Sequence, residues 1–197
     1  THRASEKSFA KAEKPDEVSS FKSVHFFRNL NSKPSLELKS TNLEIINQDI
    51  LTFKKPEGQL FRSGKSLTYS ADSGQFTQAQ NSLELKGSIE LKNALSSYLC
   101  DELTYDGRNE TIFARGRVES THRDLKTQDT IKLNSQFMRS NLKENLTQFS
   151  GNVKGVIVRR RKYEGDVKFQ ANKVELNSSK SLISLNQDVK IQRNNYY

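Results

Sequence analysis

A ten-position pattern of alternating apolar residues recurs along the chain and limits the fold more than any other feature of the sequence. Each copy reads apolar-x-apolar-x-small-x-x-apolar-x-apolar, and the last three copies place the small residue at Cys100, Ser135 and Ala171. Two earlier segments have Ser40 and Gly64 in the small position. The copy at Ser40 fits the pattern, Arg62 is out of place in the copy at Gly64, and Ser140 breaks the last position of the copy at Ser135. A valine stands eighteen residues after each of the last three small residues, at Val118, Val153 and Val189. Because these offsets are equal, we interpret the copies as an internal repeat.

Each copy has the pattern of a bent β-strand that buries one face. Alternation with a period of two is typical of a strand with one apolar side. The extra residue after the small position shifts this phase, and a β-bulge there would restore the inward face and bend the strand. A small residue at the bend lets another segment approach closely. One such hairpin cannot bury its apolar side alone, so the sequence predicts a nearly all-β chain of stacked, bent hairpins.

The hairpin turns and the domain limits follow from the polar residues between the apolar stretches. We expect turns at residues 47–49, 106–109, 141–145 and 177–180, and we place the turn of the second hairpin at residues 72–74. Residues 1–22 are polar, and we expect them to form a flexible segment before a single domain at residues 23–197. Residues 21–30 would add an edge strand to the sheet.

The composition argues against several classes of protein. No run of about 18 apolar residues exists, so no segment of this sequence reads as a membrane-spanning helix. The chain begins with Thr1, and we expect a signal peptide or a membrane anchor upstream of it. Cys100, the single cysteine, occupies a small-residue position and is interpreted as a packed residue. The three histidines have no partners at metal-ligand spacing, and no nucleophile-elbow or phosphate-loop motif occurs. We therefore predict neither an enzyme nor a bound cofactor.

The inward-facing apolar residues are the first candidate for a binding site. They must at least form the core of the protein. If the two halves of the bent sheet do not close fully, the same residues would line a trough for lipid chains, and residue types alone do not decide between the two. The predicted lining consists of Leu67, Tyr69, Leu83, Leu85, Tyr98, Leu103, Tyr105, Val118, Leu133, Met138, Val153, Phe169, Val174 and Val189.

A run of four basic residues, Arg159, Arg160, Arg161 and Lys162, is the second candidate. The chain has a formal net charge of +9, and a basic balance favours polyanions such as nucleic acid, phosphorylated lipid or an anionic membrane surface. Arginine binds phosphate with two parallel hydrogen bonds, so the run predicts a phosphate contact. The plainer alternative is a solvated strand end. A nucleic-acid-binding protein would interleave aromatic and basic residues on one face, whereas the aromatic residues here follow the inward phase.

Three segments resemble the repeat units of a known family. They are residues 67–76 (L-T-Y-S-A-D-S-G-Q-F), 99–118 (L-C-D-E-L-T-Y-D-G-R-N-E-T-I-F-A-R-G-R-V) and 149–153 (F-S-G-N-V). With their small residue before a bend and their Gly-x-Val ending, they resemble the OstA-like family of lipopolysaccharide transport proteins. The order of segments from Val24 to Val153 is most similar to the LptC branch of that family. The resemblance covers about residues 24–191.

The resemblance implies a V-shaped antiparallel β-jelly roll in the periplasm. It implies an apolar groove that receives the acyl chains of lipopolysaccharide from an inner-membrane ABC transporter. It also implies end-to-end strand pairing with similar jelly rolls and anchoring by an N-terminal membrane helix that is absent from this chain. We expect no nucleic acid as a partner, because the aromatic residues follow the inward phase. The hairpin at residues 167–191 extends beyond a compact LptC, so a soluble bridge of the LptA type stays an alternative. A carbohydrate-active β-helix also has repeats, but it would lack antiparallel hairpins.

Overall fold

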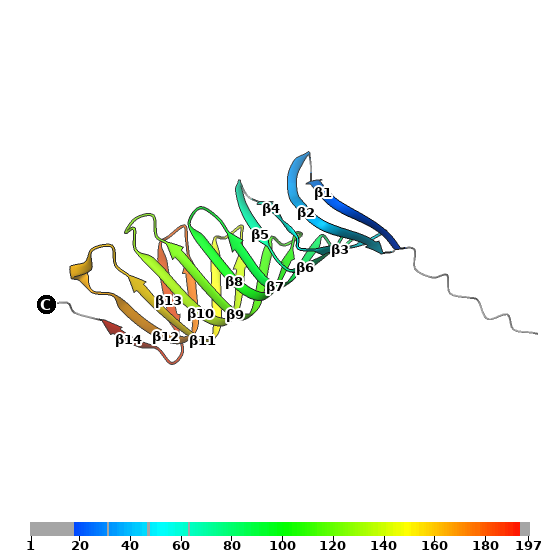
Figure 1. Cartoon of the computed structure of the whole chain (residues 1–197). Helices are drawn as coiled ribbons and strands as arrows, with labels where there is room; N and C mark the ends of the chain where they lie inside the picture. The colour runs from blue at the N-terminus through cyan, green and yellow to red at the C-terminus, as the bar shows by residue number, and fades with distance from the viewer. Residues whose placement is uncertain (1–17, 31, 47, 63, 194–197) are drawn as a thin grey trace, which may run out of the picture.

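The computed structural model describes residues 18–30, 32–46, 48–62 and 64–193, which form one antiparallel sheet (Figure 1). The strands are β1 (Val18–Leu30), β2 (Lys33–Ile46), β3 (Ile50–Lys54), β4 (Glu57–Arg62), β5 (Lys65–Ser70), β6 (Ser73–Thr77), β7 (Ser82–Lys92), β8 (Ser96–Asp106), β9 (Thr111–Arg123), β10 (Thr130–Asn141), β11 (Leu146–Val158), β12 (Val167–Asn177), β13 (Leu182–Asn186) and β14 (Lys190–Arg193), with one short 3-10 turn, η1 (Lys162–Glu164). Every strand pairing among these residues is antiparallel. The predicted all-β jelly-roll class is confirmed, and a β-helix is excluded.

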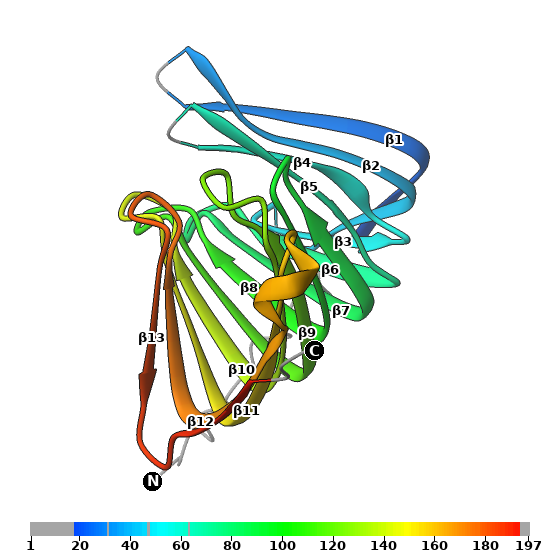
Figure 2. The same cartoon turned by 90° about the vertical axis from the view of Figure 1, so that its left-hand side faces the viewer.

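Three pairs of short strands are each one long strand that is interrupted at its bend. Strands β3 and β4 both pair with β2, β5 and β6 both pair with β7, and β13 and β14 both pair with β12. The sheet is therefore a meander of long strands, and each strand bends near its middle so that its halves belong to two walls. Figure 2 looks along the sheet and shows these walls as the two arms of a V.

The bend is produced by an extra residue in every second strand. Strands β7, β9 and β11 each shift register against their neighbours, for instance between Leu99 and Glu102 where β8 pairs with β9. The extra residue lies at Gly87 in β7, at Gly116 in β9 and at Gly151 in β11, and all three glycines have positive φ. We expected the bulge in the preceding strand, next to the small residue. The structure places it in the returning strand, because glycine adopts positive φ without steric cost.

The bends still keep the apolar residues of each strand facing inward, as the repeat predicts. In β8, Cys100 and Leu103 are both buried although two residues separate them, and β10 and β12 show the same spacing. The last repeat has no Gly-x before Val189; Gln187 and Asp188 adopt the positive φ values there instead. The expected turns of the first hairpin and of the last three hairpins are confirmed.

The second hairpin differs from the prediction. Its turn lies at residues 78–81, between β6 and β7, and not at residues 72–74. Asp72 lies at the bend between β5 and β6, where its N–H donates to the carbonyl of Gly87 and its own carbonyl accepts from the N–H of Lys55. These bonds hold the segment inside the sheet, so the chain bends there without reversing. The small residue of this copy is accordingly Ala71, and Gly64 belongs to the connection between β4 and β5.

The core fills the inside of the V. Every residue of the predicted inward row except Val189 is buried there. Val189 is 43% exposed, because it lies between β13 and β14 at the end of the sheet, where these strands pair only with β12. The placement of Val189 in the inward row was therefore wrong.

The first strand covers the other end of the sheet. Strand β1 pairs along its length with β2, so the predicted edge strand is present. It begins at Val18, which places the expected boundary between residues 22 and 23 inside a strand. Residues 1–17 of the expected flexible segment lie outside the described residues.

Candidate functional site

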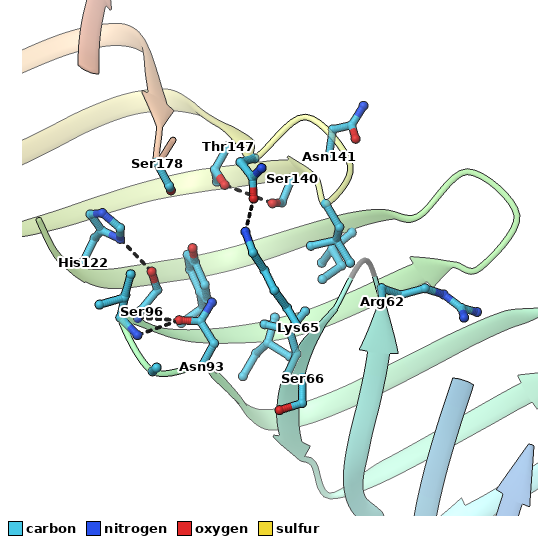
Figure 3. A pocket seen from close by; sticks show the side chains of 18 of the residues that line it. Arg62, Lys65, Ser66, Asn93, Ser96, His122, Ser140, Asn141, Thr147 and Ser178 are labelled. Atoms are coloured by element: carbon cyan, nitrogen blue, oxygen red, sulfur yellow. Dashed lines mark hydrogen bonds between the residues drawn. The ribbon is translucent and has the colours of Figure 1, made fainter. Parts of the chain in front are cut away.

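A largely apolar cavity of about 320 Å³ lies between the two walls of the V (Figure 3). Its apolar lining comes from five different strands, through Leu67, Leu91, Tyr98, Ile112 and Met138. The connection between β7 and β8 and the turn between β10 and β11 also contribute, and these two segments lie on opposite edges of the sheet. The cavity is therefore at the open side of the V, where the ends of the strands face each other.

Two cationic side chains cross this open side. Lys65, at the start of β5, donates a hydrogen bond to Oδ1 of Asn145 in the turn between β10 and β11. Figure 3 shows the Lys65 side chain extended across the cavity. Arg62, at the end of β4, donates to the hydroxyl of Tyr105, and its guanidinium lies 5.7 Å from the centre of that ring. The cavity thus has a cationic rim above an apolar interior.

Four polar side chains in the lining of the cavity are hydrogen-bonded to one another in two pairs. Ser140 and Thr147 share a hydrogen bond of 2.9 Å between their hydroxyls, and Ser96 Oγ lies 2.7 Å from Nδ1 of His122. Burial lowers the pKa of His122, although the carboxylate of Asp124 opposes this effect. The imidazole is therefore uncharged at neutral pH. An interior without formal charge suits a hydrocarbon chain better than a polar metabolite.

The predicted lining divides into two groups in the structure. Leu67, Tyr98 and Met138 line the cavity, whereas the other buried residues of the row pack against one another in the core. Sequence reasoning missed the residues of the rim, Arg62, Lys65 and Asn145. One signal was available: Ser140 is a polar residue in an apolar position of the repeat, which indicates an incompletely packed interior at that place.

The basic run is tied into the structure through the side chain of Arg159 and the backbone of Arg160. Arg159 donates from Nη1 to Oδ2 of the buried Asp129 at 2.8 Å, so its guanidinium is not available for phosphate. Nη1 of Arg161 lies 3.6 Å from Oε1 of Glu164, but the Arg161 side chain remains mostly exposed. Arg160 uses its backbone N–H to bind Asp129, and its side chain is exposed. The side chain of Lys162 lies outside the described residues.

The described residues offer little for other chemistry. No group of three or more His, Cys, Asp or Glu side chains among them is arranged to hold a metal ion. Burial, with a smaller effect from Asp101, raises the pKa of the Cys100 thiol to about 12, so this cysteine is a poor nucleophile. Among the described residues, no helix has the length and apolar character needed to cross a membrane.

The bent antiparallel sheet is similar to that of a solved periplasmic β-jelly roll. The crystal structure of LptH from Pseudomonas aeruginosa, described as the LptA-homologous periplasmic component of the lipopolysaccharide transport device, matches with a TM-score of 0.56. The sequence identity is 10%, and the match covers 65% of this chain and 94% of LptH. At this identity the likeness establishes the fold alone. A search of curated proteins finds no match.

The family is shown by the sequence itself. The profile described as lipopolysaccharide-assembly, LptC-related, matches residues 9–158, which is most of the chain. The protein therefore belongs to the LptC-related family of lipopolysaccharide assembly, whose members are non-enzymatic transport proteins. The match ends at the last residue of β11, so strands β12 to β14 lie beyond it.

Proposed function

We propose that the protein receives the acyl chains of lipopolysaccharide in the cavity and passes the lipid onward across the periplasm. The observation that carries this proposal is an apolar cavity with a cationic rim, at the open side of a bent sheet, in a chain of the LptC-related family. The apolar interior would hold hydrocarbon, and Arg62 and Lys65 would meet the lipid phosphates.

The size of the cavity supports uptake of one acyl chain before the walls part. Its volume of about 320 Å³ is at the lower end of ligand sites, which span roughly 300–1,000 Å³. Each buried methylene contributes about 0.8 kcal/mol, so even one chain would bind with useful affinity. A lipid with several chains needs more room. Separation of the walls would provide it, and this requires the contacts of Lys65 with Asn145 and of Arg62 with Tyr105 to break.

The two ends of the sheet are suited to join similar jelly rolls. Strand β1 at one end and strands β13 and β14 at the other have outer edges without a partner strand among the described residues. A sheet edge binds a further strand through its backbone hydrogen bonds. In our proposal one end meets the inner-membrane ABC transporter that supplies the lipid, the other end meets the next carrier, and a membrane anchor precedes this chain. A soluble LptA-like bridge is the second candidate, because the LptH fold matches and the sheet continues past β11.

Nucleic-acid binding is the weaker reading of the basic charge. Base stacking along a single strand uses several aromatic faces beside cations, whereas Tyr69, Tyr98 and Phe169 are buried in the core and the exposed Tyr163 offers one ring beside the basic run. Arg159, the first residue of the basic run, is paired with Asp129.

Bridging the open side of the V will block lipid uptake. In a Lys65→Cys/Asn145→Cys variant, a short bismaleimide will link the start of β5 to the turn before β11. The buried Cys100 has a raised pKa and will not compete. We expect the bridged protein to capture labelled lipopolysaccharide at least tenfold more slowly than the same variant with each thiol capped separately.

The control bridge joins two neighbouring turns without crossing the open side. Lys143 and Lys180 lie in adjacent turns, where Ser178 N donates to the carbonyl of Asn145. A bridged Lys143→Cys/Lys180→Cys variant should capture lipid normally. Normal capture by the Lys65–Asn145 bridge would show that the chains do not enter here.

A further inference from the structure

Two loops on one edge of the sheet carry large apolar side chains at their tips. Leu125, between β9 and β10, is 64% exposed, and Tyr163, between β11 and β12, is 74% exposed. These are the two largest exposed fractions among the large hydrophobic residues that the structure describes. We call residues 124–129 and 159–166 the docking loops. Neither apolar tip lines the cavity.

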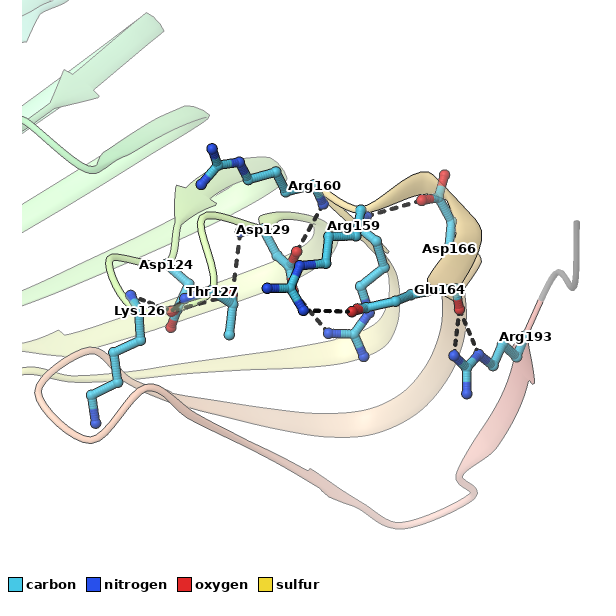
Figure 4. Close-up of polar contacts among 10 residues, drawn as sticks. Asp124, Lys126, Thr127, Asp129, Arg159, Arg160, Glu164, Asp166 and Arg193 are labelled. Atoms are coloured by element: carbon cyan, nitrogen blue, oxygen red, sulfur yellow. Dashed lines mark hydrogen bonds and ion pairs between the residues drawn. The ribbon is translucent and has the colours of Figure 1, made fainter.

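Polar contacts join the docking loops into one unit (Figure 4). Asp129 in the first loop accepts from Arg159 Nη1 at 2.8 Å and from the N–H of Arg160 at 2.9 Å in the second. Asp166 closes the second loop by accepting from the N–H of Arg159 at 2.9 Å. Arg193 of β14 donates to the carbonyl of Glu164. These contacts therefore hold the two docking loops, and with them Leu125 and Tyr163, in a fixed position relative to each other.

The charges of the docking loops are segregated. The carboxylates of Asp124 and Asp129 are buried, 7% and 4% exposed. Burial alone would raise the pKa of Asp129, but hydrogen bonds from Arg160, Arg159 and Thr127 outweigh it and hold the pKa below its usual value. The side chains of Lys126, Arg160 and Arg161 are exposed, and Figure 4 shows Lys126 and Arg160 extending away from the buried carboxylates. The loops therefore present cations and apolar tips to solvent and keep Asp124 and Asp129 inside, whereas Glu164 and Asp166 are half-buried.

We propose that the docking loops bind an anionic lipid bilayer surface, with Leu125 and Tyr163 inserted among the headgroups. Aromatic and aliphatic side chains flanked by cations are favoured at this interface. The apolar side chains reach the boundary between headgroups and acyl chains, while the cations stay among the charged headgroups. Exposed Lys and Arg residues add attraction to anionic lipids. A protein partner would need a surface of about 800 Å², whereas two projecting tips are enough to penetrate a headgroup layer. The proposal does not depend on what the cavity holds.

A single tryptophan tests this contact directly. The chain contains no tryptophan, so Tyr163→Trp makes residue 163 the one indole in the molecule. With vesicles of phosphatidylcholine in which part of the lipid is phosphatidylglycerol, we expect a blue shift of its emission and quenching by brominated acyl chains. Both effects should weaken with added salt and be absent with pure phosphatidylcholine. Phe27→Trp, which is on β1 and also exposed, should show neither.

Charge and apolar variants separate the two parts of the contact. Arg160→Gln/Arg161→Gln should weaken flotation with the anionic vesicles roughly tenfold or more, and Leu125→Ser/Tyr163→Ser should do so as well. Lys143→Gln/Lys180→Gln, in turns on the opposite edge, should leave flotation unchanged. All of these side chains are exposed or in turns, so melting temperatures should stay the same, as should capture of lipopolysaccharide by the cavity. Equal binding to both vesicle types, wild-type flotation of the docking-loop variants, or binding to an acidic polypeptide but not to vesicles would overturn the proposal.

Discussion

Replacing Leu142 by tryptophan will weaken lipopolysaccharide binding about a hundredfold. Leu142 is half-buried in the turn after β10 and lines the cavity. The larger indole would occupy space that about four methylenes of an acyl chain need. At about 0.8 kcal/mol each, their exclusion costs about 3 kcal/mol, and each 1.4 kcal/mol is tenfold in affinity. Titration of the protein with labelled lipopolysaccharide measures the effect.

A matched substitution on the outer face controls for the added indole. Phe113 is 44% exposed and stacks on Phe137 outside the sheet. Phe113→Trp should therefore bind lipopolysaccharide like the wild type. Unchanged affinity in Leu142→Trp, with melting temperatures equal to those of the control, would mean that the acyl chain lies elsewhere.

Replacing Gly116 by alanine will destabilise the fold by about 3 kcal/mol. Gly116 has a φ of +75°, and a Cβ there would lie 2.6 Å from Oδ2 and 2.9 Å from Cβ of Asp101. The conformation alone costs an alanine roughly 1–2 kcal/mol, and overpacking against the neighbouring strand adds roughly 1–3 kcal/mol. Urea unfolding followed by circular dichroism gives the free energy of unfolding.

Gly64 provides the matched control for this bend. Its φ of +74° is nearly the same, but nothing lies within 4 Å of its added Cβ. Gly64→Ala should therefore cost only the conformational part, roughly 1–2 kcal/mol. The difference between the two variants measures the close approach of Asp101 at the bend. Equal losses would show that the bend does not depend on this contact.

The repeat predicts the hairpins because its information is local. Alternation fixes which side chains share a face, and the spacing after Cys100 reports the bend within one strand. The second hairpin was misplaced because Gly64 and Ala71 are both small residues beside apolar ones. What distinguishes them is the hydrogen bonding of Asp72 to Gly87 and Lys55, and such contacts between distant segments leave no local pattern.

The candidate site was less predictable than the fold. Periodicity assigns Met138 and Val153 to the inward face equally, but only Met138 borders open space. Whether two facing side chains touch depends on the separation of the walls, which the pattern does not encode. In the same way, the sequence shows four consecutive cations from Arg159 onward, whereas Asp129, thirty residues earlier, neutralises the first of them.

Met138 offers the most direct measurement of the central proposal. It is the one methionine in the sequence and lines the cavity, so a photoreactive methionine analogue places a crosslinker at that site. Irradiation with lipopolysaccharide should give an acyl-chain adduct that mass spectrometry maps to residue 138. Moving the label to the outer face, with Met138→Leu and Phe113→Met, should abolish the adduct. An adduct at residue 113 but not at 138, or none at either position, would contradict the assignment of the cavity as the acyl-chain site.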